Sequence, residues 1–136
     1  MNAQSFTLKR TLRALALGIL VGIVLVTVYG FVDSWLSVLI TGHEAVMPPS
    51  AVAFASFLMS TEYALLIAAI CAPLWLVLSK IGWDGPLAAA LLGFAATSAI
   101  WVLTNQPFWG PTRHDVALAL CGAAAGLATW WAAHRR

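Results

Sequence analysis

The chain has 136 residues, of which 62% are hydrophobic and only 9% are charged, and its formal net charge is +2. Soluble domains are about one-quarter charged, so 7 basic and 5 acidic side chains cannot cover the surface of a soluble domain. Disorder is excluded because it requires low hydrophobicity and high charge. Nucleic-acid binding is not indicated, since the few basic residues form no basic face. The composition therefore predicts a single integral membrane domain over residues 1–136.

The first apolar run, 14–32, carries no charge and follows the basic residues Lys9, Arg10 and Arg13. This order is also typical of a signal peptide, but the segment 29–33 is bulky and offers no small-x-small cleavage site. An apolar helix of about 20 residues crosses a hydrocarbon core of about 30 Å. We therefore expect 14–32 to be an uncleaved first membrane span.

The next segment, 33–62, is long for a connection inside a compact bundle. Pro48 and Pro49 divide it, and Ser50 is placed to cap the apolar stretch that follows. The second half has two interpretations. It either forms a separate interfacial or re-entrant helix, or it extends the second span to about 29 residues, about 43 Å, with Glu62 in the hydrocarbon. We favour the first interpretation, because it keeps Glu62 out of lipid, and predict an outer cap over 33–62.

Three further apolar runs without charge follow at 63–78, 87–103 and 116–133. All must be helices, because lipid offers no water to satisfy exposed backbone groups. Turn-forming residues lie between the second and third runs, and Pro73 is expected to kink the second. The predicted fold is an all-α four-transmembrane-helix antiparallel bundle with an outer cap.

The basic residues predict the orientation of this bundle. Six of the seven fall on one side if the helices alternate in direction, namely Lys9, Arg10, Arg13, Lys80, Arg135 and Arg136. Only Arg113 falls on the other side, so the positive-inside rule places both termini in the cytoplasm, with a bacterial inner membrane as the expected location. The tryptophans gather near both predicted interfaces, as membrane aromatic belts do.

Small residues recur at four-residue spacing in the predicted spans. Gly18 and Gly22 form one such pair, Gly122 and Gly126 another, and Gly93 lies on a stripe of small residues in the third span. Small residues let membrane helices approach closely. The pattern indicates either packing inside one bundle or an interface with a second copy or a larger membrane complex.

Acidic residues and histidines gather on the predicted outer side. We identify a candidate cation or proton site from residues in separate segments: His43, Glu44, Glu62, His114 and Asp115. Imidazole and carboxylate groups bind Zn²⁺ and other divalent cations, although no ligand spacing such as HxxxH is present and the metal stays unknown. The alternative is that each residue acts alone. Asp115 is then an N-cap of the fourth span, and Glu62 lies in the first turn of the second span, near the positive end of its dipole.

Several chemistries lack their signatures. No Asp, Glu, Lys, Arg or His lies inside the four predicted spans, whereas ion-coupled transporters usually keep one there. No nucleophile elbow, zinc-protease motif or phosphate-binding loop is present, so we expect neither an enzyme nor a bound cofactor. Cys71 and Cys121 lie in apolar runs and are expected to behave as small hydrophobic residues.

The leading functional hypothesis is a small non-enzymatic inner-membrane protein that acts as an accessory or oligomeric subunit through helix–helix packing. The alternative is a small transporter or channel for a cation or a small neutral solute that enters from the outer face. A pore former of the holin type also fits the size and the basic tail. The expected partners are the lipid bilayer and a second copy or a larger membrane complex.

Overall fold

The computed structural model describes residues 8–42, 47–105 and 113–135. They form four helices: α1 (Leu8–Thr41), α2 (Pro49–Ile81), α3 (Pro86–Asn105) and α4 (Arg113–His134). Across these residues there is no strand. Each helix is long and apolar enough to cross a membrane. The predicted all-helical class with four candidate spans is thus confirmed.

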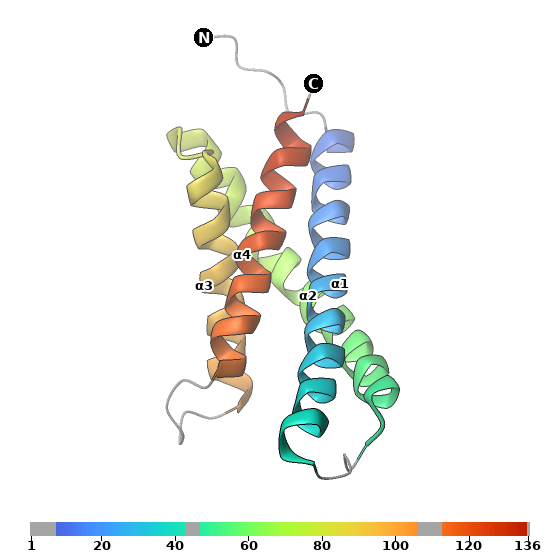
Figure 1. The fold of residues 1–136 in the computed structure, drawn as a ribbon. Helices are drawn as coiled ribbons and strands as arrows, with labels where there is room; N and C mark the ends of the chain where they lie inside the picture. The colour runs from blue at the N-terminus through green and yellow to red at the C-terminus, as the bar shows by residue number, and fades with distance from the viewer. Residues whose placement is uncertain (1–7, 43–46, 106–112, 136) are drawn as a thin grey trace.

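The start of α1 and the end of α4 lie at one end of the molecule, together with the α2–α3 connection (Figure 1). We call this the terminal end, and the opposite end, where α1 finishes and α4 begins, the loop end. α1 packs against α2 and α4, and α4 also packs against α3. Of the four pairs of helices in contact, α2 and α3 pack least, because α2 lies beside α1 at the loop end and reaches α3 near their connection (Figure 1).

The predicted separate helix in the second half of 33–62 is wrong. α1 continues without a break to Thr41, and α2 begins at Pro49 and runs to Ile81, so residues 50–62 belong to the same helix as 63–78. Proline favours the first position of a helix, where no backbone N–H is needed. Past that start, the Thr61 hydroxyl donates to the Phe57 carbonyl of its own helix, and no residue there breaks it.

Helix ends follow the local sequence. α2 ends at Gly82, whose φ of 84° is the left-handed conformation that glycine adopts without steric cost. The Gly82 N–H donates to the Ser79 carbonyl and the Trp83 N–H to the Leu78 carbonyl. Pro86 then starts α3. The short connection holds α2 and α3 as neighbours at the terminal end.

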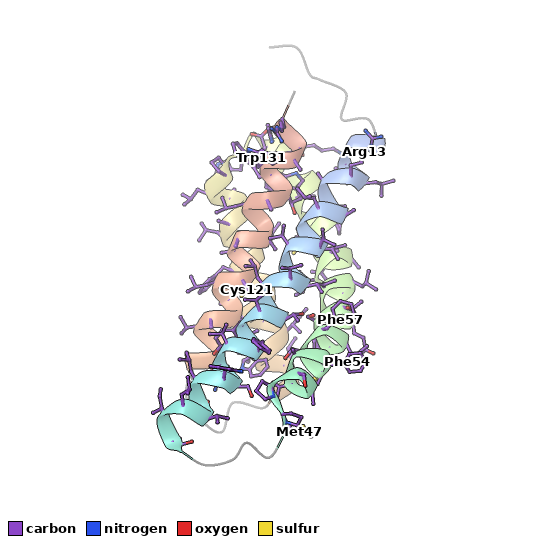
Figure 2. All side chains as sticks on the ribbon, turned by 45° about the vertical axis from the view of Figure 1, so that its right-hand side comes forward. Arg13, Met47, Phe54, Phe57, Cys121 and Trp131 are labelled. Atoms are coloured by element: carbon purple, nitrogen blue, oxygen red, sulfur yellow. The ribbon has the colours of Figure 1, made fainter. Side chains whose placement is uncertain are left out.

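Few side chains are buried within the described part of the chain. The buried hydrophobic residues are mostly small and comprise Ala14, Ala89, Ile100, Ala119 and Ala133. Long apolar side chains point outward from all four helices (Figure 2). This pattern is expected of helices whose surroundings are apolar, because large residues then gain nothing by turning inward.

Glycines set how closely the helices approach. A Cβ added to Gly93 would overlap the Gly122 carbonyl oxygen, and one added to Gly126 would overlap that of Ala89. On α1, a Cβ on Gly18 would overlap the Thr129 hydroxyl of α4, whereas one on Gly22 would lie 3.5 Å from the Ala125 Cβ, an ordinary contact. The α3–α4 crossing is therefore a close approach of two backbones.

Candidate functional site

A cavity of about 590 Å³ lies between the helices and is lined by residues of all four. Ligand pockets for small molecules span about 300–1,000 Å³. The cavity is therefore in the range of a small organic molecule and much larger than a single ion needs.

The walls at the middle of the cavity are apolar. They carry residues such as Val26 on α1, Ile67 on α2, Leu92 on α3 and Cys121 on α4. The hydroxyl of Thr97 lines the cavity but donates to the Gly93 carbonyl of its own helix at 2.9 Å. The middle of the cavity thus offers few hydrogen bonds to a ligand.

A polar cluster of Tyr29, Asp33 and His114 lines the cavity toward the loop end. The Tyr29 hydroxyl lies 2.7 Å from Nδ1 of His114. Oδ2 of Asp33 lies 3.9 Å from the same nitrogen. The Tyr29 and His114 rings meet edge to face, with centroids 6.0 Å apart. We refer to these three residues as the outer cluster, after their predicted side of the membrane.

The helices bring this cluster together from distant parts of the chain. Tyr29 and Asp33 are one turn apart on α1 and share a face. His114 lies in the first turn of α4, which packs along α1. Because α1 nears its end where α4 starts (Figure 1), residues 85 positions apart meet at the loop end.

The cluster can both donate and accept hydrogen bonds. When Nδ1 of His114 carries no proton, it accepts from the Tyr29 hydroxyl, and Nε2–H then stays a donor. The Asp33 carboxylate accepts only, when ionised. No group of three metal-binding side chains occurs among the described residues. The cluster is thus suited to a polar, hydrogen-bonding group of a ligand.

Three residues of the predicted cation site, Glu62, His114 and Asp115, lie in the described part of the chain. His114 lines the cavity, whereas Glu62 is exposed on α2 and does not line it. Asp115 is half-buried in the first turn of α4, beside His114. His43 and Glu44 lie outside the described residues.

Sequence reasoning missed Tyr29 as a site residue and treated Asp33 as the end of a span. The signal that was available is their spacing, since a tyrosine and an aspartate four positions apart share one helix face. This spacing indicates a shared face only if the first helix continues past residue 32. The charge of Asp33 instead favours an end of the span at that point.

The terminal end is held by a different set of contacts. The Trp130 indole N–H donates to the Asp84 backbone carbonyl at 2.7 Å. Nε2 of His134 lies 3.8 Å from the Asp84 carboxylate, and its ring stacks on Trp130. These contacts tie the C-terminal turn of α4 to the α2–α3 connection.

Comparisons with protein families, with curated proteins and with solved structures found no match. The cavity and the outer cluster are therefore the observations from which function is inferred.

Proposed function

We propose that the protein is integral to a bacterial inner membrane, where its helices form an antiparallel bundle with both termini in the cytoplasm. Four long apolar helices support insertion, since helices satisfy their backbone groups internally. The concentration of basic residues toward the terminal end supports the orientation. At about 1.5 Å per residue the 34 residues of α1 extend about 51 Å. This exceeds the hydrocarbon core of about 30 Å, so α1 tilts or projects beyond it.

The function we propose is binding and passage of a small uncharged solute by a small transporter or channel. The observation that carries it is the cavity of about 590 Å³ shared by all four helices. Of its described lining residues, only Asp33 and His114 are acidic or basic, and both lie toward the loop end. A cation at mid-depth needs polar ligands to replace its water, so apolar walls favour an uncharged solute.

The glycines weaken the subunit hypothesis in its original form. Gly93, Gly122 and Gly126 make their close approaches within one chain, which accounts for their spacing without a second copy. A different surface supports a subunit function as the second candidate. The α1–α2 hairpin projects beyond α3 and α4 at the loop end (Figure 2). Ile40 at the end of α1 and Phe54 near the start of α2 are 78% and 64% exposed, and exposed apolar surface can mark an interaction site.

Neighbouring alanines on α2 provide the test of the cavity. Ala68 lines the cavity, whereas Ala69 is exposed and does not. Protein purified from membranes is analysed by native mass spectrometry for bound small molecules. We expect an adduct on the wild type and on Ala69→Phe, and none on Ala68→Phe, because the phenyl ring fills the cavity. Cys71→Phe is a second filling variant, in case Ala68→Phe does not fold.

An adduct that persists equally in both filling variants contradicts a ligand in the cavity, as does the absence of any adduct from the wild type. The subunit function is tested in the same spectra through the mass of the complex. A larger species that Ile40→Asn with Phe54→Asn disrupts, while the monomer stays folded, would favour the second candidate.

A further inference from the structure

The cavity is much longer than it is wide. On α1 its lining runs from Leu15 to Ser34, and 19 residues at about 1.5 Å each correspond to about 28 Å. A volume of about 590 Å³ over this length gives the centre of a water-sized sphere a mean cross-section of about 21 Å², which corresponds to a free width of about 8 Å. A compact molecule would fill only part of such a space, whereas an elongated one follows it.

The two ends of the cavity differ in polarity. The outer cluster supplies a hydroxyl, an imidazole and a carboxylate toward the loop end. The opposite end is lined by Leu15, Trp75 and Trp130. The one polar hydrogen of Trp130 is already donated to the Asp84 carbonyl. The hydroxyls of Thr97 and Thr129, which also line the cavity, donate to carbonyls of their own helices. The Trp75 indole N–H is a further donor at the terminal end. The largest group of polar side chains that a ligand meets is therefore at the loop end.

We infer that the ligand is a single-chain amphiphile, with a hydrocarbon chain along the bundle axis and an uncharged hydroxyl head at the outer cluster. This inference rests on the proposed function and specifies its substrate class. A hydroxyl can donate to the Asp33 carboxylate. It can also accept from the Tyr29 O–H when His114 Nδ1 carries its proton and donates to the Tyr29 oxygen. A carboxylate head would lie beside the Asp33 carboxylate, which has the same charge when ionised, whereas a hydroxyl head carries no charge.

The arrangement of α2 fits a ligand that arrives from the bilayer. Of the four pairs of helices in contact, α2 and α3 pack least, and α2 diverges from α3 toward the loop end (Figure 1). An amphiphile in a membrane already has its chain in the hydrocarbon and its head at the interface. It would enter between α2 and α3 with the head at the level of the outer cluster and would not need to reorient.

Four probes with twelve carbons separate shape, head group and charge. Dodecan-1-ol carries the proposed chain and head, cyclododecanol has the hydroxyl on a compact ring, dodecane lacks the head, and dodecanoate carries a charge. Each is titrated into lipid nanodiscs that hold the full chain, and thermal unfolding is followed. A ligand that binds the folded state raises the unfolding midpoint. Ala68→Phe fills the cavity, so any shift of its unfolding midpoint comes from the effect of the probe on the bilayer and not from binding in the cavity.

We expect dodecan-1-ol to stabilise the wild type well beyond its effect on Ala68→Phe, and cyclododecanol not to do so. The half-saturating mole fraction of dodecan-1-ol should be about threefold to tenfold lower than that of dodecane, because one hydrogen bond to the head strengthens binding by about that factor. Dodecanoate should bind at least about tenfold more weakly than dodecan-1-ol, since it adds a like charge.

A matched pair of tyrosines tests the position of the head. Tyr29 belongs to the outer cluster, and Tyr63 lines the same cavity from α2. Tyr29→Phe should weaken dodecan-1-ol binding about threefold to tenfold and leave dodecane unchanged. Tyr63→Phe removes a hydroxyl elsewhere in the same cavity and should weaken dodecan-1-ol binding less than Tyr29→Phe does. Because each probe is compared within one variant, a general loss of stability in Tyr29→Phe does not affect the result.

The outcomes distinguish the two proposals. If cyclododecanol or dodecanoate stabilises as well as dodecan-1-ol, and Ala68→Phe abolishes both effects, the cavity binds ligands but the inferred class is wrong. If dodecan-1-ol binds but Tyr63→Phe weakens it as much as Tyr29→Phe does, the head is misplaced. If no probe distinguishes the wild type from Ala68→Phe, both the class and the cavity function are contradicted.

Discussion

The α3–α4 crossing predicts opposite effects for one chemical change at two glycines. In Gly126→Ala the new Cβ would overlap the Ala89 carbonyl oxygen and lie 2.9 Å from its carbonyl carbon. Real Cβ atoms rarely come closer than 3.4 Å. The two backbones must therefore separate by at least about 0.5 Å, and more to clear the oxygen. In Gly22→Ala the Cβ makes an ordinary contact at 3.5 Å, and nothing has to move.

The expected magnitudes follow from two opposing terms. Replacing glycine by alanine inside a helix stabilises by about 0.5–1 kcal/mol, whereas overpacking costs about 1–3 kcal/mol. Gly22→Ala should therefore raise the free energy of unfolding by about 0.5–1 kcal/mol. Gly126→Ala should lower it, and the difference between the two variants should be about 1–3 kcal/mol, because the helix term cancels.

Equilibrium unfolding in mixed micelles with increasing dodecyl sulfate, followed by circular dichroism, measures both variants. A third variant identifies the obstructing atom. Adding Ala89→Gly to Gly126→Ala should not restore stability, because the clash is with the backbone and not with a side chain. Equal shifts of the same sign in Gly22→Ala and Gly126→Ala, or full rescue by Ala89→Gly, would refute the close crossing.

Three further outcomes are expected. A reporter fused after Arg136 should be cytoplasmic and one inserted at His43 external, and a cytoplasmic signal at His43 would contradict the proposed orientation. Trp130→Phe should lower the free energy of unfolding by about 0.5–1.5 kcal/mol, because it removes the hydrogen bond to the Asp84 carbonyl. Trp83→Phe is the exposed control and should not change the free energy of unfolding measurably. Equal losses in the two variants would argue against the bond from Trp130 to Asp84. Gly30→Ala should destabilise less than Gly126→Ala, since it meets the rotatable Ser56 hydroxyl; a larger loss would show that the α1–α2 contact is the more rigid one.

The sequence was informative about the helices because their apolar runs leave few alternatives. Uncharged stretches at 63–78, 87–103 and 116–133 each lie inside one helix of the structure. The turn between α2 and α3 was also predictable, because Gly82 and Pro86 have local preferences that need no tertiary contact.

The extent of α1 and α2 was not predictable in the same way. The sequence prediction ends the first span before Asp33 and starts the second after Glu62, because a charge in lipid is costly. That rule assumes that a charge on a long helix has lipid around it. Asp33 instead lies near His114 on the cavity wall, and the 33-residue length of α2 allows part of that helix to project beyond a membrane. The ends of α1 and α2 are thus set by helix length and tertiary contacts and not by the positions of Asp33 and Glu62 in the sequence.

Only one residue of the outer cluster, His114, could be predicted from the sequence. His114 could be selected from its chemistry, but its neighbours Tyr29 and Asp33 are 85 and 81 positions away in the sequence. Their proximity depends on how α1 packs along α4, which spacing within one helix does not reveal. The glycine spacing behaved similarly, since it predicted close packing without indicating which helices would meet.

The tight crossings and the cavity have a common origin in the small residues. Glycines and alanines bring the backbones of α3 and α4 together, yet they contribute little volume to the interior of the bundle. The cavity is partly open to its surroundings, so molecules of the bilayer can reach its apolar walls. Apolar cavities hold water poorly, so filling this one requires an apolar group. An elongated amphiphile from the bilayer meets that requirement, and its hydroxyl finds hydrogen-bonding groups at the outer cluster.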